Sequence, residues 1–129
     1  MKAACHRSAE YEPVWAKIVR LQQGGVPGVL DLFSGCGGLS LGLQRAGFAI
    51  LAGLDSDPHA SASHAFNFHA GSSRHSAPRD LTDLEVTPGS LRVSLGLVSV
   101  AEAVDIVVGG PPLPGLRPNR PCQAPGDRR

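Results

Sequence analysis

The feature that most constrains this chain is a glycine-rich turn between an apolar segment and an amphipathic one. Residues 29–33 read VLDLF, residues 34–38 read SGCGG, and leucines recur over residues 39–43. A short apolar run before clustered glycines is typical of a buried strand, and the leucines that follow predict a helix that stops at Gly47. The sequence therefore predicts a strand, a glycine turn and a helix in immediate succession.

A second apolar run repeats the strand pattern. Residues 48–54 close on Asp55 and Asp57, and Pro58 then suits the first turn of a helix that Asp57 would cap. This helix is predicted to continue through residues 60–68.

The next part of the chain alternates in the same way. A Gly/Ser stretch at residues 71–77 predicts a loop, and residues 80–84 form a short polar segment. Residues 88–95 are compatible with one helix, and residues 104–108 form a third apolar run that ends in two glycines and two prolines. Strands that alternate with helices imply a parallel sheet with covered faces, so the predicted fold class is α/β.

The two ends of the chain differ from this middle part. Residues 1–28 form a mixed leader, in which Val14, Ile18 and Leu21 would lie on one face of a short helix. We expect that helix to pack against the domain, with binding of a partner as the alternative. Residues 113–129 are rich in proline and arginine and have no helix or strand pattern, so we expect a disordered tail. A nucleic-acid-binding arm is the alternative for the tail.

Length, charge and cysteine content exclude several classes of protein. A chain of 129 residues suits one domain, and its net charge of +1 produces no global field that would attract nucleic acid. Cys5, Cys36 and Cys122 are odd in number and far apart, which argues against a disulfide framework and for a reducing, cytoplasmic compartment. No apolar run is long enough for a membrane span, and the first twenty residues lack the apolar core of a secretion signal.

The glycine turn and Asp55 together indicate a ligand site. Free amide groups at a helix N-terminus favour an anionic or polar ligand group, and glycine allows the ligand to approach closely. In nucleotide-binding βαβ units, an acidic residue about 20 positions later reaches the ribose hydroxyls. Asp55 lies twenty residues after Gly35. A plain structural turn with Asp55 as a solvated cap is the alternative interpretation.

These segments resemble the DNA cytosine-5 methyltransferase family. Residues 29–43 resemble its first motif, residues 55–57 the second, residues 80–82 the third and residues 105–112 the start of the fourth. The resemblance implies a Rossmann-like α/β domain, of which this chain would hold the opening half with an incomplete parallel sheet. It also implies transfer of a methyl group from S-adenosylmethionine to carbon 5 of cytosine in DNA. The partial catalytic domain would occupy residues 29–112.

The resemblance assigns roles to individual positions. Phe33 would stack on the adenine, Asp55 would bind the ribose hydroxyls, and Asp80 would accept a hydrogen bond from the adenine amino group. The glycine turn would hold the methionine end. Ser56 stands where the family commonly has a bulky apolar residue. The cofactor-binding residues that the resemblance implies are Phe33, Ser34, Gly35, Cys36, Gly37, Gly38, Asp55, Ser56, Asp80, Leu81 and Pro111.

The match ends before the family's nucleophile. The fourth motif continues Pro-Pro-Cys-Gln, and its thiolate attacks carbon 6 of a flipped-out cytosine. Here Leu113 follows Pro112, and leucine has no nucleophilic atom. Cys122 is ten residues farther along, in the tail, without a rigid strand to position its sulfur. We therefore expect no catalytic residue and no methyl transfer by this chain.

The residues after Pro112 also contain no Glu-Asn-Val motif and no target-recognition region. The sequence thus favours a truncated, inactive chain. An enzyme completed by another chain, a non-catalytic cofactor-binding or regulatory stub, and a non-functional frameshift product are the alternatives.

A shift of reading frame would explain the break at Leu113. Residues 113–117, LPGLR, can be encoded by CTG CCA GGG CTT CGN. Read one base later, the same bases encode Cys-Gln-Gly-Phe, which is the family's continuation. A GC-rich gene read out of frame also tends to encode proline and arginine. A natural variant with a divergent tail is the competing explanation.

Four histidines form a loose series between the second and third motifs. His59, His64, His69 and His75 are five, five and six residues apart, and no cysteine or acidic pattern joins them. We expect a solvated polar face rather than a zinc site. Cys36 is a small residue in a tight loop, for which we expect no catalytic role.

Overall fold

Three parallel strands form the centre of the computed structural model, which describes residues 12–97 and 103–112. The strands are β1 (Gly28–Leu32), β2 (Ala49–Leu54) and β3 (Ile106–Gly109), in the spatial order β2-β1-β3. β1 is central, and the last residues of all three strands lie opposite one another. The predicted α/β class with a parallel sheet is confirmed.

Five helices connect and cover these strands within the described residues: α1 (Glu12–Gln22), α2 (Gly38–Arg45), α3 (Pro58–His69), α4 (Ser73–Ser76) and α5 (Pro88–Leu95). The helices predicted after the glycine turn, after Pro58 and over residues 88–95 are confirmed. The short α4 lies where a loop was predicted. It is a single turn in which the Ser72 carbonyl accepts hydrogen bonds from the amides of His75 and Ser76, each at 3.0 Å.

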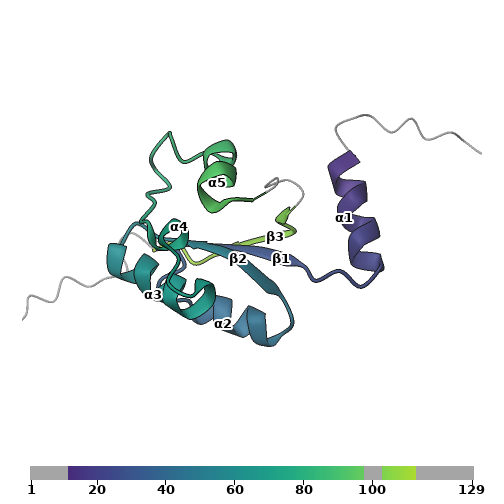
Figure 1. Cartoon of the computed structure of the whole chain (residues 1–129), viewed down its shortest axis with the longest axis horizontal. Coiled ribbons are helices and arrows are strands. Elements are labelled where there is room, and N and C mark those ends of the chain that lie inside the picture. Colours follow the sequence, from purple (N-terminus) through teal and green to yellow (C-terminus); the bar gives the residue numbers. More distant parts are fainter. Residues whose placement is uncertain (1–11, 98–102, 113–129) are drawn as a thin grey trace, which may run out of the picture.

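The apolar core lies between the sheet and α5. In Figure 1, α5 lies on one side of the sheet, and α2 and α3 lie on the other. The buried core residues are Leu30, Ala52, Leu54, Leu91, Leu95 and Val104. A capping box fixes the start of α5, since Thr87 Oγ1 accepts from the Ser90 amide and Ser90 Oγ accepts from the Thr87 amide. The cap directs Leu91 and Leu95 onto the sheet.

The opposite face of the sheet is more polar. Successive side chains of a strand point to opposite faces, so Val29 and Asp31 face α2 and α3 while Leu30 faces α5. Gly53 of β2 also lies on this face, and its lack of a side chain lets the ring of His64 approach closely. The buried residues between this face and its helices thus include polar groups and a glycine beside apolar residues such as Val29 and Ala65.

Helix α1 is attached to the rest of the structure by polar contacts. Lys17 Nζ donates to the Val104 carbonyl, and Arg20 Nη2 donates to Asp105 Oδ1 at 2.6 Å. Val14 is 49% exposed and Ile18 is 37% exposed. The expected helix forms, but the expectation that its apolar face packs against the domain is wrong, because that face is exposed and two cationic side chains make contacts with the segment before β3. Figure 1 shows α1 beside the sheet rather than over one of its faces.

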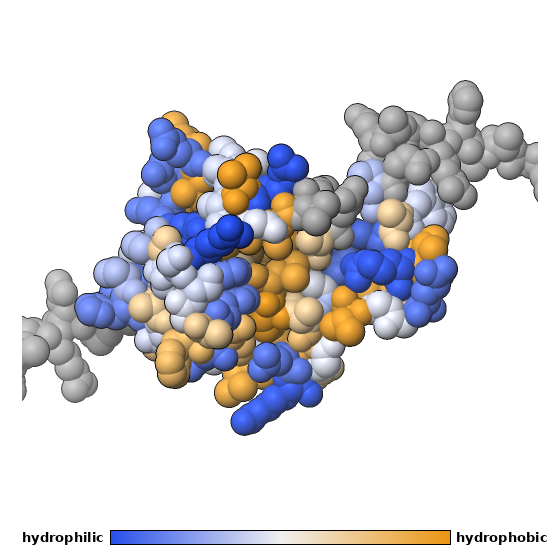
Figure 2. Space-filling model, viewed as in Figure 1, coloured by the Kyte–Doolittle hydropathy of each residue, from blue (hydrophilic) through white to orange (hydrophobic). Residues whose placement is uncertain are grey.

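Apolar surface is exposed at several places. Figure 2 shows orange surface across the middle of the molecule, where the sheet lies in the same view. Val107 on the edge strand β3 is 58% exposed, and Phe66 and Leu84 are also exposed. An unpaired edge with an exposed valine is a site at which sheets add further strands.

Within the described part of the chain, no helix combines the length and the apolarity that crossing a membrane requires. The predicted disordered tail, Leu113 and Cys122 lie outside the described residues.

Candidate functional site

The loop between β1 and α2 reverses direction through three left-handed residues. Phe33, Gly35 and Gly37 have φ values of 57°, 54° and 100°. The Ser34 amide donates to the Leu54 carbonyl at 3.0 Å, which ties the start of the loop to the end of β2. Gly37 is the N-cap of α2, and a Cβ there would lie 2.3 Å from the ring of Phe68. Glycine is therefore required at this position by both conformation and space.

Asp55 joins the two loops at the carboxyl ends of β1 and β2. Its Oδ2 accepts from the Gly35 amide and its Oδ1 from the Asp57 amide, both at 2.9 Å. The twenty-residue spacing predicted from the sequence therefore corresponds to direct contact. Asp57 in turn caps α3, since its Oδ1 accepts from the Ala60 amide at 2.7 Å.

A third segment, residues 79–82, lies beside the two loops that follow β1 and β2. The Arg79 amide donates to the Asp55 carbonyl at 2.7 Å. Asp80 Oδ1 accepts from both the amide and the hydroxyl of Thr82, at 2.8 and 2.7 Å. These hydrogen bonds hold the pKa of Asp80 below its usual range, so the carboxylate is anionic at neutral pH. Burial lowers the pKa of Arg79.

The three segments enclose a cavity of about 180 Å³ at the carboxyl edge of the sheet. Parallel α/β sheets bind ligands at this edge. The cavity is lined by Phe33, Leu54, Asp55, Ser56, Arg79, Asp80, Leu81 and Thr82. Five of the residues that the sequence singled out lie here together, although they are spread over nearly fifty positions.

Arg79, Thr82 and Leu54 also line this cavity and were not predicted from the sequence. Thr82 had a detectable signal, since Asp-x-Thr is a frequent local turn in which the carboxylate accepts from the residue two positions on. No sequence signal predicts Arg79 in the cavity, because its position depends on a backbone hydrogen bond with Asp55 at the end of β2.

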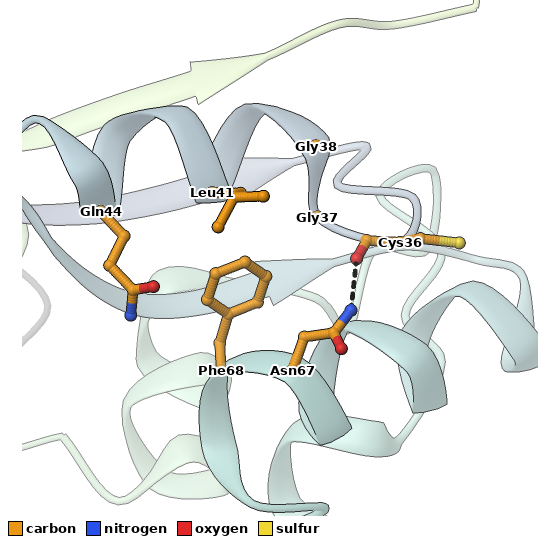
Figure 3. Close-up of a pocket in the computed structure, with 7 residues that line it drawn as sticks. All are labelled: Cys36, Gly37, Gly38, Leu41, Gln44, Asn67 and Phe68. Atoms are coloured by element: carbon orange, nitrogen blue, oxygen red, sulfur yellow. Dashed lines mark hydrogen bonds between the residues drawn. The ribbon is translucent and has the colours of Figure 1, made fainter.

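The glycine loop lines a second cavity, of about 430 Å³, between α2 and α3. Figure 3 shows Cys36, Gly37 and Gly38 along one side, with Leu41, Gln44 and Phe68 turned toward one another across it. Asn67 Nδ2 donates to the Cys36 carbonyl at 3.1 Å, which fastens the loop to α3 (Figure 3). Ser34 begins the loop, and its buried hydroxyl has no hydrogen-bond partner among the described residues.

Pro111 is separate from both cavities. It is exposed, follows the end of β3, and lines neither of them. The structure thus brings most of the predicted cofactor residues into the linings of these two cavities, whereas Pro111 follows β3 at the same edge of the sheet and lines neither.

The prediction of a solvated histidine face is wrong for His64. This ring is fully buried, and its Nε2 lies 3.0 Å from Ser40 Oγ. Ser40 Oγ donates to Asp31 Oδ2 at 2.7 Å. Asp31 places a carboxylate inside an otherwise apolar strand, and a buried carboxylate needs hydrogen-bond partners. The prediction of a solvated histidine face did not take this requirement into account.

His69 and His75 also lie partly inside the structure. Their rings stack with centroids 3.7 Å apart. Burial, with smaller contributions from His75 and His64, lowers the pKa of His69 to about 4. Among the described residues, no group of three or more histidine, cysteine or acidic side chains could hold a metal ion. Cys36 is exposed and not in a disulfide.

Comparison with known proteins identifies a family that the chain matches and several related proteins. The C-5 cytosine-specific DNA methylase family matches residues 28–115. The chain is 41% identical over 91 residues to the type II methyltransferase M.XorII of Xanthomonas oryzae pv. oryzae, which covers 67% of this chain and 19% of the relative. It is 34% identical over 88 residues to the type II methyltransferase M.DdeI of Desulfomicrobium norvegicum, covering 68% and 19%.

The chain thus spans about a fifth of the length of these curated relatives. No solved structure gives a significant match.

Proposed function

The chain belongs to the C-5 cytosine-specific DNA methylase family, and on that basis we propose that residues 28–112 form the S-adenosylmethionine side of a cytosine-5 methyltransferase site. The whole protein of this type would methylate carbon 5 of cytosine in DNA, in the cytoplasm. S-adenosylmethionine supplies an electrophilic methyl group on a positively charged sulfur. The chain's own contribution is to bind and orient the adenosine part.

One observation carries this proposal: Phe33, Asp55 and Asp80 line a single cavity beside the glycine loop. The cavity offers an aromatic ring, two carboxylates and apolar walls from Leu54 and Leu81, which suit a nucleoside with an apolar face and polar edges. The residues present therefore fit an adenosine-containing cofactor.

Each side chain has a distinct role in the proposed site. The ring of Phe33 is exposed and would stack on the adenine. Asp55 uses one lone pair of each oxygen on a backbone amide, and the remaining lone pairs would accept from the ribose hydroxyls. Asp80 is held as an anion, which makes its carboxylate a strong acceptor for the adenine amino group.

We also propose that this chain does not transfer the methyl group. Leu113 follows the two prolines at the end of the fourth motif, where the family has its thiol. Without a thiolate, carbon 6 of cytosine is not attacked and carbon 5 does not become nucleophilic. The proposed activity of this chain is therefore cofactor binding without catalysis.

Cofactor binding is tested by calorimetry of S-adenosylmethionine with the purified chain and with Asp55→Asn. We expect the variant to bind about tenfold or more weakly, because a hydrogen bond to a charged group contributes roughly 1.5–3 kcal/mol. Asp83→Asn is the matched control, since Asp83 also accepts from an amide two positions on but lies outside the cavity. Equal affinities of the parent and Asp55→Asn would refute the site.

Catalytic silence is tested with DNA that carries 5-fluorocytosine, which traps the covalent intermediate of a thiol nucleophile. We expect no adduct and no transfer of labelled methyl groups. An adduct that disappears in Cys122→Ser would show that the tail cysteine acts as the nucleophile after all.

A further inference from the structure

A chain of three buried polar side chains lies directly beneath the glycine loop. Ser40 Oγ donates to Asp31 Oδ2 at 2.7 Å and lies 3.0 Å from His64 Nε2. The three residues come from β1, α2 and α3, and each is at most 1% exposed. Polar groups buried in this way are costly unless their hydrogen bonds are made, so the network fixes the relative positions of these three elements.

The hydrogen bonds determine the tautomer of the neutral His64 ring. Ser40 has one hydroxyl proton, and it donates that proton to the Asp31 carboxylate. His64 Nε2 must therefore be the donor in the contact with Ser40, which makes the neutral ring the Nε2–H tautomer. Its Nδ1 is buried and has no hydrogen-bond partner among the described residues. Protonation would place an N–H at this Nδ1, where the described structure provides no acceptor.

The same ring positions the glycine loop by contact. A Cβ on Gly37 would lie 3.1 Å from His64 Cδ2, and one on Gly53 would lie 2.4 Å from His64 Nε2. The ring thus sits between β2 and the residue that begins α2. Phe68, one turn along α3, packs against it with ring centroids 4.7 Å apart. Phe68 also lines the cavity beside the loop (Figure 3).

We propose that His64 is a positioning residue for the glycine loop, and that its neutral Nε2–H form, acting through Ser40 and Asp31, holds the loop in the conformation that binds cofactor. The expected effect of His64 on cofactor affinity rests on the proposed function. The expected effect of His64 on the conformation of the glycine loop does not depend on the cofactor.

The proposal implies that acid weakens binding. Asp31 of β1 faces His64 and favours the protonated ring. The ring of His69 of α3 lies with its centroid 5.9 Å from that of His64, and His75 of α4 interacts electrostatically with His64. The contacting residues of α2 and β2 are Ser40 and Gly53. Burial outweighs the attraction of Asp31 and lowers the pKa of His64. The loop conformation is therefore complete above the ordinary histidine pKa of about 6.5 and is lost as the pH falls through the lower pKa of the folded protein.

The experiment measures two quantities between pH 4.5 and 8: the affinity for S-adenosylmethionine by calorimetry, and the amide chemical shift of Gly37 in the ligand-free protein by NMR. We expect both to titrate in the parent protein. His64→Gln offers an amide donor to Ser40 that does not titrate. It should bind at pH 7 within about threefold of the parent and lose the acid-dependent change in both readouts. His64→Leu should bind about tenfold more weakly at pH 7, because the donor is gone.

Two controls separate His64 from its neighbours. His59→Gln lies on the exposed side of the same helix and should retain the parent's pH profile. His75→Gln removes a ring of the adjacent cluster and should also retain it. A His64→Gln protein whose Gly37 shift titrates as in the parent overturns the proposal, as does a parent whose shift is constant in the folded range. If the parent binds no cofactor at any pH, the proposed function fails, and the Gly37 shift still decides the role of His64.

Discussion

Phe33 has an unfavourable backbone conformation at a position where the proposed site requires an aromatic ring. The residue has a φ of 57°, a left-handed conformation that costs a residue with a side chain roughly 1–2 kcal/mol. Phe33 is 41% exposed, so part of its surface is open to a ligand although the rest is buried. Backbone strain of this kind concentrates at functional sites. The placement is explained if the ring has a ligand to contact.

We expect Phe33→Gly to separate stability from binding. The free energy of unfolding should change by less than about 1 kcal/mol, because relief of the left-handed cost is opposed by the additional chain entropy of glycine and by loss of the partly buried ring. The affinity for S-adenosylmethionine should fall about tenfold, because the stacking surface is lost. Urea denaturation and calorimetry measure the two effects.

Ala70→Gly is the control for Phe33→Gly. Ala70 is also left-handed, with a φ of 50°, but it ends α3 outside the cavity. Ala70→Gly should raise the free energy of unfolding by about 0.5 kcal/mol, because it relieves the same left-handed cost without removing a ring, and it should keep the parent's affinity. Unchanged cofactor binding in Phe33→Gly would show that the ring does not contact the adenine.

At the scale of elements, an ion pair between Arg20 and Asp105 contributes to the attachment of α1. Asp105 accepts from the Gly28 amide at 2.7 Å and from Arg20, and its side chain is 4% exposed. Burial raises the pKa of Asp105, but these hydrogen bonds and the charges of Arg20 and Lys17 outweigh burial and hold it below its usual range. The contact joins α1 to the segment that precedes β3.

We expect Arg20→Gln to lower the free energy of unfolding by about 1–2 kcal/mol at pH 7, since the partner carboxylate is buried while Arg20 itself is partly exposed. Asp105 has a lowered pKa in the folded state, so its contribution is present above the ordinary value of about 3.9 and is lost as the pH falls through the folded value. The difference between the parent and Arg20→Gln should therefore shrink below about pH 4.

Denaturation at several pH values measures this difference. Arg45→Gln, on an exposed residue at the end of α2, should be neutral within about 0.5 kcal/mol. A difference for Arg20→Gln that stayed constant down to about pH 3 would contradict the assignment to Asp105.

At the scale of the whole molecule, the sheet formed by the described residues has two edge strands and exposed apolar residues such as Val107. The family match covers residues 28–115, and Leu113 stands where the resemblance predicts a cysteine. A domain boundary normally falls in a linker that few contacts cross, whereas this departure comes four residues after the end of β3. We propose that a shift of reading frame explains this position.

We expect the nucleotide sequence after the Pro112 codon, read one base later, to encode Cys-Gln-Gly-Phe and then a long open frame with a Glu-Asn-Val segment. Sequencing the gene through this region determines directly what the shifted frame encodes. Protein expressed from the corrected frame should methylate cytosine, unlike the present chain. A stop codon within a few residues of the shifted frame would instead favour a natural divergent tail.

Local features were predictable because their causes are short-range. The strand before the glycine turn, the Asp57 cap and the helix over residues 88–95 follow from periodicity and capping chemistry within a few residues. The structure moves their boundaries by one or two positions: β1 ends at Leu32, since Phe33 is left-handed. The place of α1 was not predictable, because its apolar spacing indicates a helix and does not specify what the helix contacts.

The order of strands and helices, and the spacing of the glycine turn from Asp55, could be read from the sequence because they depend on neighbours along the chain. That Phe33, Asp55 and Asp80 share one cavity emerges only in three dimensions, where parallel strands bring their carboxyl ends to one edge. The burial of His64 against Ser40 also depends on the tertiary structure. That contact joins residues twenty-four positions apart on two helices, and no local pattern encodes a pairing made across the face of a sheet.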